Sequence, residues 1–322
     1  MKPVLCFGEV LIDFLNVGQH REGPLALAEY RQYPGGAPAN AAVAVAKLGG
    51  EARFAGQVGS DPFGEFLATA LREYGVNTDY LHRHEWAKTP LAFVILDAHG
   101  DRSFAFHRHE TADLLFQEQQ IDERWFDGQP VFHICSNTLT EHAIAGVTRA
   151  ALARAKAAGA TVSFDVNLRH NLWPGHCVDR ETVNACVFEA DLLKFAREEL
   201  AYLAAGDDED YLKTCLHGGA QLILVTDGPK PVRYITGHSH GYIDAPPVTA
   251  VDTTAAGDAF SGALLYGLSC ATGLAAITAE SRYLNGLLNF AVQCSALTVT
   301  RPGAFPALPT FDEVEGHWID MP

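Results

Sequence analysis

One short stretch, residues 252–258, combines small side chains with a carboxylate just ahead of a predicted helix. It reads Asp-Thr-Thr-Ala-Ala-Gly-Asp. Backbone N–H groups at a helix N-terminus have no intrahelical acceptor, and the helix dipole adds partial positive charge there. Ala255, Ala256 and Gly257 are small enough to let a phosphate reach those N–H groups, so they are candidates for an anion hole. Asp258, in the same turn, could accept the proton of a hydroxyl that attacks the phosphorus atom.

A purely structural interpretation fits the same stretch. Asp is common in the first turn of a helix, and small residues allow a helix to pack closely on a strand. The local residues alone leave phosphate binding and close packing about equally open.

Further polar residues follow two predicted strands. Asp165, Asn167 and Arg169 alternate on an extended segment after the strand 161–165, so their side chains would project to one side. Lys194 comes after two leucines of another strand and could reach a phosphate as a point charge. Ligands bind outside the carboxyl ends of strands in open α/β sheets, so these four residues are candidates for a phosphate and magnesium region.

Asp13, Gly36, Asn40 and Arg108 have structural interpretations when they are considered alone. Asp13 lies on an apolar strand and could reach solvent at a sheet edge, although a polar ligand would suit it as well. Gly36 belongs to a Gly/Pro-rich turn, and Asn40 opens a helix, where Asn is a common capping residue. Arg108 ends a predicted strand, and an exposed Arg at such a place is usually a solvated charge.

Composition favours a globular protein in a reducing compartment. The 322 residues are 48% hydrophobic and 19% charged, which is enough for a sizeable core. The formal net charge of −16 argues against nucleic acid or an anionic membrane as a partner, so any phosphate site must be built locally. Seven scattered cysteines without C-x-x-C spacing indicate free thiols, and we see no signal peptide or transmembrane run, so we expect a cytoplasmic protein.

The hydrophobic periodicity predicts an α/β protein. Strands are expected at 4–7, 10–17, 53–58, 91–96, 102–108, 131–135, 161–165, 192–195 and 222–226, with a hairpin near 234–242. Helices are expected at 41–48, 61–74, 141–158, 180–189, 197–204 and 275–296, besides the helix after residue 258. The alternation of strands and helices predicts a doubly wound, mostly parallel sheet with helices on both faces, in a single domain, 1–322. A hairpin signal at 97–101 does not fit this alternation and predicts a small separate sheet.

Several sequence blocks resemble the ribokinase-like PfkB carbohydrate kinases, and most closely the fructokinases among them. The blocks that carry the resemblance are, in chain order, 8–14, 35–42, 104–108, 164–169, 224–229 and 252–258. The blocks are spread along the sequence, and the resemblance covers nearly the whole chain. The resemblance implies a ribokinase-like fold in which a small β-sheet lid, formed by segments near 11–33 and 88–109, covers the sugar. It also implies that two lids pair in a homodimer.

The same resemblance implies roles for individual residues. It implies Asp258 as the catalytic base, Ala255, Ala256 and Gly257 as the anion hole, and Asp13, Gly36, Asn40 and Arg108 as sugar-binding residues. The implied residues for ATP are Asn167, Arg169, Lys194, Thr226, Gly228 and Gly257. Glu199 would order Mg²⁺ through water, with Asp165 in the magnesium region. The implied ligands of a monovalent cation, K⁺, mostly through carbonyl groups, are Asp252, Thr254, Thr298, Arg301 and Gly303.

The sequence departs from the family pattern at four positions. Ala196 stands where the magnesium motif has Asn, and Ala307 replaces a Ser of the cation site. Pro231 and Val292 stand in the nucleotide region where the family has Gly and Asn. The implied activity is transfer of the γ-phosphate of MgATP to the 6-hydroxyl of D-fructose. The alternatives are another acceptor (ribose, 2-keto-3-deoxygluconate or an aminoimidazole riboside), or a non-catalytic sugar-binding regulatory protein.

Overall fold

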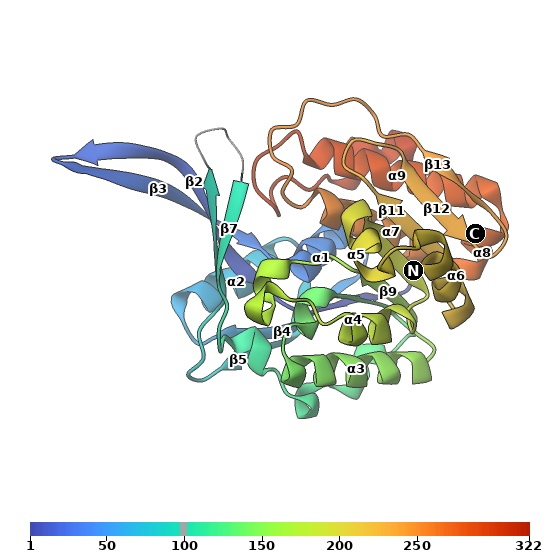
Figure 1. The fold of residues 1–322 in the computed structure, drawn as a ribbon, viewed down its shortest axis with the longest axis horizontal. Helices are drawn as coiled ribbons and strands as arrows, with labels where there is room; N and C mark the ends of the chain where they lie inside the picture. Colours follow the sequence, from blue (N-terminus) through green and yellow to red (C-terminus); the bar gives the residue numbers. More distant parts are fainter. Residues whose placement is uncertain (97–101) are drawn as a thin grey trace.

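The computed structural model describes residues 1–96 and 102–322, which form a large sheet between helices and a small second sheet beside it (Figure 1). The turn that we predicted at 97–101 lies outside the described residues. Within the described part of the chain, no helix is long and apolar enough to cross a membrane.

The central sheet has nine strands in the order β13-β12-β11-β10-β9-β8-β1-β4-β5. Its strands are β1 (Val4–Phe7), β4 (Ala52–Gly59), β5 (Asn77–His84), β8 (Val131–Cys135), β9 (Thr161–Asp165), β10 (Leu192–Ala196), β11 (Leu222–Thr226), β12 (Val232–Thr236) and β13 (His240–Ile243). All neighbours pair in parallel except β12 with its two neighbours, which are antiparallel. The predicted mostly parallel α/β sheet is therefore confirmed.

Two hydrophobic cores fill the space between this sheet and the helices on its two faces. Successive residues of β1 alternate between them, because Val4 and Cys6 belong to one core, and Leu5 and Phe7 to the other. The first core is completed by α1 (Ala37–Lys47), α2 (Pro62–Glu73), α7 (Ala256–Cys270) and α9 (Ser281–Thr298), and the second by α3 (His142–Ala157), α4 (Arg180–Val187), α5 (Arg197–Ala204) and α6 (Asp208–Gly218). A strand buried on both faces explains the continuous apolar runs of the sequence.

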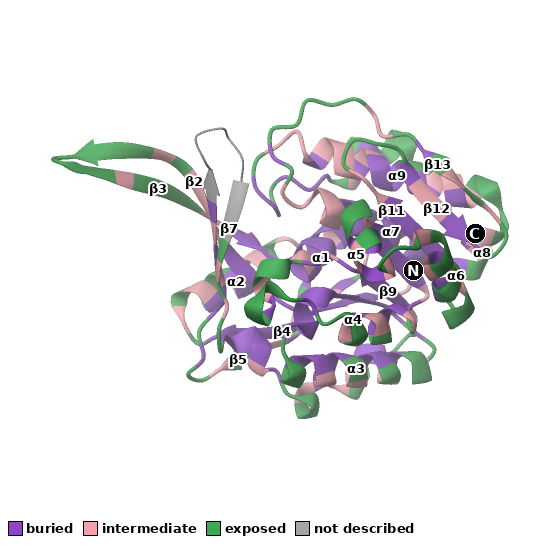
Figure 2. Cartoon of the chain, viewed as in Figure 1, coloured by how far each residue is buried: buried purple, intermediate pink, exposed green. Residues whose placement is uncertain are grey.

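The small sheet has the order β3-β2-β6-β7. Its strands are β2 (Leu11–Glu22), β3 (Leu25–Gly35), β6 (Leu91–Leu96) and β7 (Arg102–His107). The β2–β3 hairpin projects from the body of the molecule, and its outer half is exposed on both faces (Figure 2). We predicted no strand between residue 18 and residue 33, because an exposed strand shows no alternation of apolar and polar residues.

Three other elements differ from the predictions. Strand β5 and helix α6 were not predicted, and the helix expected over 275–296 is two helices, α8 (Leu274–Ala279) and α9. Glu280 separates them because its backbone is extended, with φ −123° and ψ 122°. The remaining α-helix of the described residues, α10 (Phe311–Val314), lies near the end of the chain.

Candidate active site

A cavity of about 460 Å³ lies where the carboxyl ends of the central strands meet the first turns of α1 and α7. Of the residues singled out from the sequence, it is lined by Asp13, Gly36, Asn40, Asp165, Asn167, Arg169, Lys194, Glu199, Thr226, Gly228, Thr254, Ala255, Ala256, Gly257 and Asp258. Residues that are far apart in the chain thus meet at the edge of the sheet where open α/β folds bind ligands.

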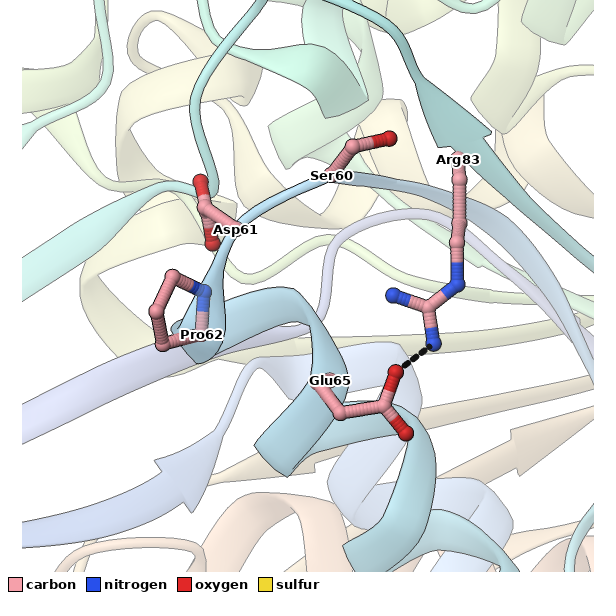
Figure 3. A pocket seen from close by; sticks show the side chains of 5 residues that line it. All are labelled: Ser60, Asp61, Pro62, Glu65 and Arg83. Carbon is pink, nitrogen blue, oxygen red and sulfur yellow. Dashed lines mark hydrogen bonds and ion pairs between the residues drawn. The ribbon is translucent and has the colours of Figure 1, made fainter.

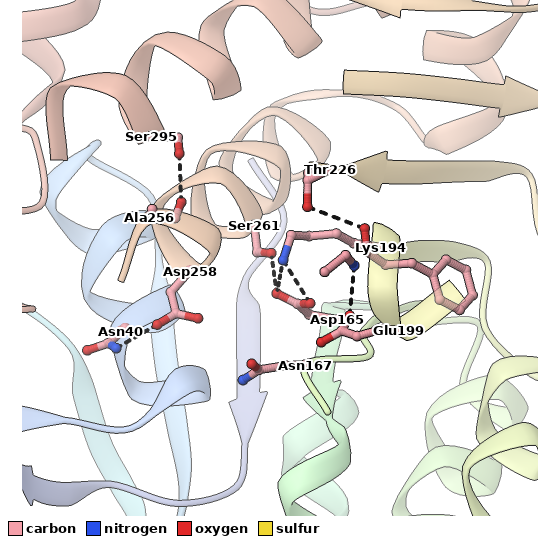
Figure 4. A network of polar contacts seen from close by, with 12 residues as sticks. Asn40, Asp165, Asn167, Lys194, Glu199, Thr226, Ala256, Asp258, Ser261 and Ser295 are labelled. Atoms are coloured by element: carbon pink, nitrogen blue, oxygen red, sulfur yellow. Dashed lines mark hydrogen bonds and ion pairs between the residues drawn. The ribbon is translucent and has the colours of Figure 1, made fainter. Parts of the chain in front are cut away.

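The first turn of α7 forms one wall of this cavity. Ala255 precedes the helix in the left-handed conformation, with φ 60° and ψ 9°, which an alanine adopts at a cost of roughly 1 kcal/mol. The Ser295 hydroxyl donates a hydrogen bond to the carbonyl of Ala256 at 2.9 Å and holds the turn from α9 (Figure 4). The first N–H groups of a helix have no intrahelical acceptor, so this wall has the character of an anion-binding site.

Asp258 lies on the same turn and faces α1. Its Oδ2 accepts a hydrogen bond of 2.6 Å from the Nδ2 of Asn40, which orients the carboxylate (Figure 4). Burial raises the pKa of Asp258 to about 6, with a smaller upward contribution from Asp165, while the bond from Asn40 lowers it. A carboxylate with this pKa is ionised at neutral pH and can accept a proton from a nearby hydroxyl.

Asp13 is the second carboxylate on this side of the cavity. Burial and, to a smaller extent, the negative charges of Asp258 and Asp252 raise its pKa to about 7, although Arg169 acts to lower it. Gly35, opposite this strand, leaves the room that the carboxylate occupies, because a Cβ there would lie 2.1 Å from the Oδ2 of Asp13. A polar group in this position can bind hydroxyls of a ligand.

Lys194 and Asp165 form a buried ion pair on the opposite wall (Figure 4). The Nζ of Lys194 donates to both carboxylate oxygens at 2.9 and 2.8 Å, and the Ser261 hydroxyl donates to Oδ2 at 2.9 Å. Burial alone would lower the pKa of Lys194, but Asp165 and Glu199 beside it raise that pKa above its usual value. A Cβ on Gly257 would lie 3.1 Å from the Nζ, so this permanent positive charge borders the first turn of α7.

Glu199 joins two strand ends. Its Oε1 accepts from the backbone N–H of Leu168 at 2.7 Å, and its Oε2 accepts from that of Ala196 at 2.7 Å. Burial raises its pKa. Its predicted contribution to a magnesium shell stays a prediction, and within the described residues no group of three or more His, Cys, Asp or Glu side chains could hold a metal ion.

The segment after β9 is not the regular extended chain that we predicted. Asn167 has a left-handed backbone with φ 40°, so the chain turns at this residue. The three side chains of Asp165, Asn167 and Arg169 nevertheless line the same cavity, because the turn follows the carboxyl end of the strand.

The residues expected to hold a monovalent cation lie beside this cavity. Asp252 connects two segments, since its Oδ1 accepts from the N–H of Thr254 at 2.8 Å and its Oδ2 from that of Gly303 at 2.9 Å. The side chains of Thr298 and Arg301 point elsewhere: the first donates to the carbonyl of Cys294, and the second pairs with Glu313. Any contribution of Thr298 and Arg301 to a cation site would come from backbone carbonyls.

Arg108 is not among the described residues that line the cavity, and its predicted contact with the sugar stays a prediction. Its side chain is 3% exposed, its Nε donates to Asp113 at 2.6 Å, and its Nη2 donates to the carbonyl of Asn137 at 2.9 Å. Asp113 follows Arg108 by five residues and folds back on it, which buries both charges as a pair.

Glu9 and Asn137 line the cavity although sequence analysis did not single them out. Both are buried, and the Nδ2 of Asn137 donates to the Oε1 of Glu9 at 2.8 Å. The sequence held one signal for Glu9, since a carboxylate inside the apolar run between Val4 and Ile12 is costly to bury unless it has a polar partner.

A second hollow on the surface is lined by Ser60, Asp61, Pro62, Glu65 and Arg83 (Figure 3). Its polar groups serve the fold, because Asp61 accepts from the N–H groups of Gly64 and Thr89, and Arg83 pairs with Glu65 at 2.7 Å. That ion pair is largely exposed and contributes little to stability.

Comparison with known proteins agrees with this geometry. Residues 1–310 match the pfkB family carbohydrate kinases. The structure of fructokinase with bound ATP from Xylella fastidiosa is 42% identical and covers 98% of this chain and 97% of its own, with a TM-score of 0.91. The fructokinase from Vibrio cholerae O395 in fructose-, ADP- and calcium-bound form is 34% identical, with 99% of both chains covered and a TM-score of 0.85. The curated probable fructokinase-7 of Arabidopsis thaliana is 40% identical, over 97% of this chain and 91% of that protein.

The chain therefore belongs to the pfkB family of carbohydrate kinases, as the sequence blocks indicated. The relatives from Xylella fastidiosa, Vibrio cholerae O395 and Arabidopsis thaliana are all named fructokinases or probable fructokinases.

Proposed function

We propose that this protein is an ATP-dependent fructokinase that transfers the γ-phosphate of ATP to the 6-hydroxyl of D-fructose. The observation that carries the proposal is the position of Asp258, since Asn40 of α1 orients its carboxylate and Ala256 and Gly257, on the same turn of α7 as Asp258, line the cavity. The Vibrio cholerae relative, which binds fructose and ADP, supports the choice of sugar and nucleotide.

In this proposal the acceptor sugar binds to Asp13, Gly36 and Asn40, with its primary hydroxyl at Asp258. Asp258 is ionised at neutral pH and takes the hydroxyl proton as the oxygen attacks. The N–H groups of Ala256 and Gly257 face the negative charge that develops on the transferred group.

The nucleotide lies along the other half of the cavity. Lys194, Arg169 and Asn167 contact its phosphates, and Thr226 and Gly228 contact its ribose. Lys194 stays charged, and its pairing with Asp165 fixes it beside the anion hole, which supports a role as a positioned positive charge.

In this proposal Glu199, through water, and Asp165 would hold Mg²⁺, which would supply positive charge against the phosphates. Asp252, Thr254, Thr298, Arg301 and Gly303 would hold K⁺, mostly through their carbonyls.

We further propose that the protein is a cytoplasmic homodimer that pairs through the small sheet. Val17, Leu25 and Tyr30 support this pairing, because they are exposed apolar residues of the β2–β3 hairpin. The seven cysteines are free thiols, as expected of a protein in a reducing compartment.

The experiment is an ADP-release assay with MgATP and a panel of sugars. We expect kcat/KM for fructose to exceed that for ribose and glucose by at least ~10-fold, because a site that hydrogen-bonds particular hydroxyls rejects analogues that leave its polar groups unpaired. A nuclear magnetic resonance spectrum of the product assigns the phosphorylated hydroxyl, and the Asp258→Asn protein gives the background. A faster reaction with ribose, a nucleoside or a keto-acid sugar would contradict the choice of fructose, and no turnover with any sugar would contradict the kinase.

A further inference from the structure

Three buried oxygen atoms of residues that line the cavity lack a hydrogen-bond partner among the residues that the structure describes: the Oδ1 of Asn40, the Oε2 of Glu9 and the Oδ1 of Asn137. The last two belong to side chains that contact each other. The other ends of the same two groups are already joined, because the Nδ2 of Asn137 donates to the Oε1 of Glu9 at 2.8 Å. The backbone N–H of Ala37 donates to the same Oε1 at 3.1 Å.

An ionised Glu9 cannot satisfy this arrangement. A carboxylate and an amide oxygen are both acceptors, and each buried acceptor left unpaired costs roughly 1–3 kcal/mol. A protonated carboxyl group has one O–H donor. Placed on Oε2 of Glu9, that proton can be donated to the Oδ1 of Asn137, so that acid and amide form a cyclic pair with two hydrogen bonds and both orphan oxygens gain a partner.

The charges around Glu9 agree with a neutral side chain. The titratable groups that interact electrostatically with Glu9 are Arg108, Asp113, Asp13 and Cys135. Arg108 is the single cation among them, and Asp113 already neutralises it at 2.6 Å. Burial raises the pKa of Glu9, and the attraction of Arg108 opposes this only in part.

We propose that Glu9 is a neutral, protonated positioning residue that fixes the acceptor-sugar wall of the site through Asn137 and Ala37. This inference rests on the proposed sugar-kinase function. Ala37 is the first residue of α1, and Asn40, one turn later, orients Asp258. The two segments touch closely, since a Cβ on Gly36 would lie 2.6 Å from the carbonyl oxygen of Glu9. Glu9 thereby couples the start of β2 to the start of α1.

The decisive comparison is between Glu9→Gln and Glu9→Ala. A glutamine amide can donate to Asn137 and accept from Asn137 and Ala37, so it reproduces the protonated acid without any ionisation. We expect Glu9→Gln to keep KM for the sugar within about twofold of the parent, and Glu9→Ala to raise it about 10-fold or more, with KM for ATP nearly unchanged in both. If Glu9→Gln raised KM for the sugar as much as Glu9→Ala does, the proposal would be overturned, because a charged carboxylate would then be required.

The protonation state can be observed without turnover. Infrared spectroscopy of the intact protein at neutral pH should show a C=O band of protonated carboxylic acids, to which Asp13 also contributes because its pKa is about 7. The band should lose the contribution of Glu9 in Glu9→Gln and stay unchanged in Glu123→Gln, a matched change at an exposed site. An unchanged band in Glu9→Gln would refute a neutral Glu9, whichever sugar the enzyme uses. If another sugar proves to be the acceptor, the choice of fructose is contradicted, but the infrared evidence for a protonated Glu9 is unaffected.

The pH dependence gives a third measure. Raising the pH ionises Glu9 and removes its donor, so KM for the sugar should rise at alkaline pH in the parent protein. Glu9→Gln cannot ionise and should lack this rise. The same alkaline rise in both proteins would assign it to another group and would count against the role of Glu9.

Discussion

We expect Asp258 to act as the catalytic base and, at the same time, to lower the free energy of unfolding of the protein. Replacing it with asparagine keeps the shape and one acceptor for Asn40 but removes the group that takes the proton. We expect kcat to fall by at least ~10²-fold, the usual contribution of a general base. KM for the sugar should change little, because the binding contacts of Asp13, Gly36 and Asn40 remain.

The same substitution should stabilise the fold at neutral pH. The pKa of Asp258 is about 6 in the folded protein, against 3.8 for an ordinary aspartate, so the folded state binds the proton more tightly than the unfolded state. Below the lower value both states are protonated and the group contributes nothing. Above pH 6 the ionised carboxylate destabilises the fold by about 3 kcal/mol for a shift of about two pH units. Asp258 is only partly buried, so cavity water screens part of this, and we expect a gain of about 1–2 kcal/mol.

Urea unfolding of the parent and of Asp258→Asn at several pH values measures this gain. The difference in free energy of unfolding should be near zero at pH 4, grow between pH 4 and pH 6, and stay constant above. Asp127→Asn, at an exposed position, is the control and should show no such rise. A variant that keeps near-normal turnover would remove Asp258 from the role of base, and one less stable than the parent at pH 7 would refute the burial argument.

Three further predictions concern the ion pair, the cation and the assembly. Lys194→Met leaves Asp165 buried without its cation and should lower the free energy of unfolding by about 3–5 kcal/mol, and adding Asp165→Asn should recover part of the loss; additive losses in urea unfolding would contradict a coupled pair. Activity should be higher in K⁺ than in Na⁺, because we expect the cation beside Asp252 to order the anion hole, and equal rates in K⁺, Na⁺ and cation-free buffers would exclude this. Light scattering at micromolar concentration should give the mass of a dimer, and Leu25→Asp on the small sheet should shift the measured mass toward that of the monomer. A monomeric mass for the parent protein would contradict the proposed dimer.

The sequence predicted those features that depend on local pattern. Apolar runs bounded by turn residues identified most central strands, and their alternation with helices predicted the parallel sheet. The small residues before Asp258 indicated a helix N-terminus that borders a site, and the structure places that turn in the cavity wall. These predictions succeeded because the periodicity of apolar side chains and the choice of turn residues depend only on residues that are close together in the sequence.

Features that depend on partners distant in the chain could not be predicted in this way. Strand β3 is polar along most of its length and is recognisable only by its pairing with β2. Arg108 looks like an exposed strand end until Asp113 folds back on it and Asn137, twenty-nine residues further on, accepts its second hydrogen bond. In both cases the deciding interaction is made by the tertiary structure rather than by the local sequence.

The charge balance of the cavity also depends on the tertiary structure rather than on the local sequence. The net charge of −16 implied that a phosphate site must be built locally, yet most of the charged residues among the described lining of the cavity are acidic. The acidic residues there are Glu9, Asp13, Asp165, Glu198, Glu199 and Asp258, and the basic ones are Arg169 and Lys194. Such a wall can accept an anionic nucleotide only if protons, backbone N–H groups and bound cations offset its carboxylates. Protonation is favoured by the raised pKa values of Glu9, Asp13, Glu199 and Asp258. These pKa values are raised mainly by burial, which no single stretch of sequence reveals.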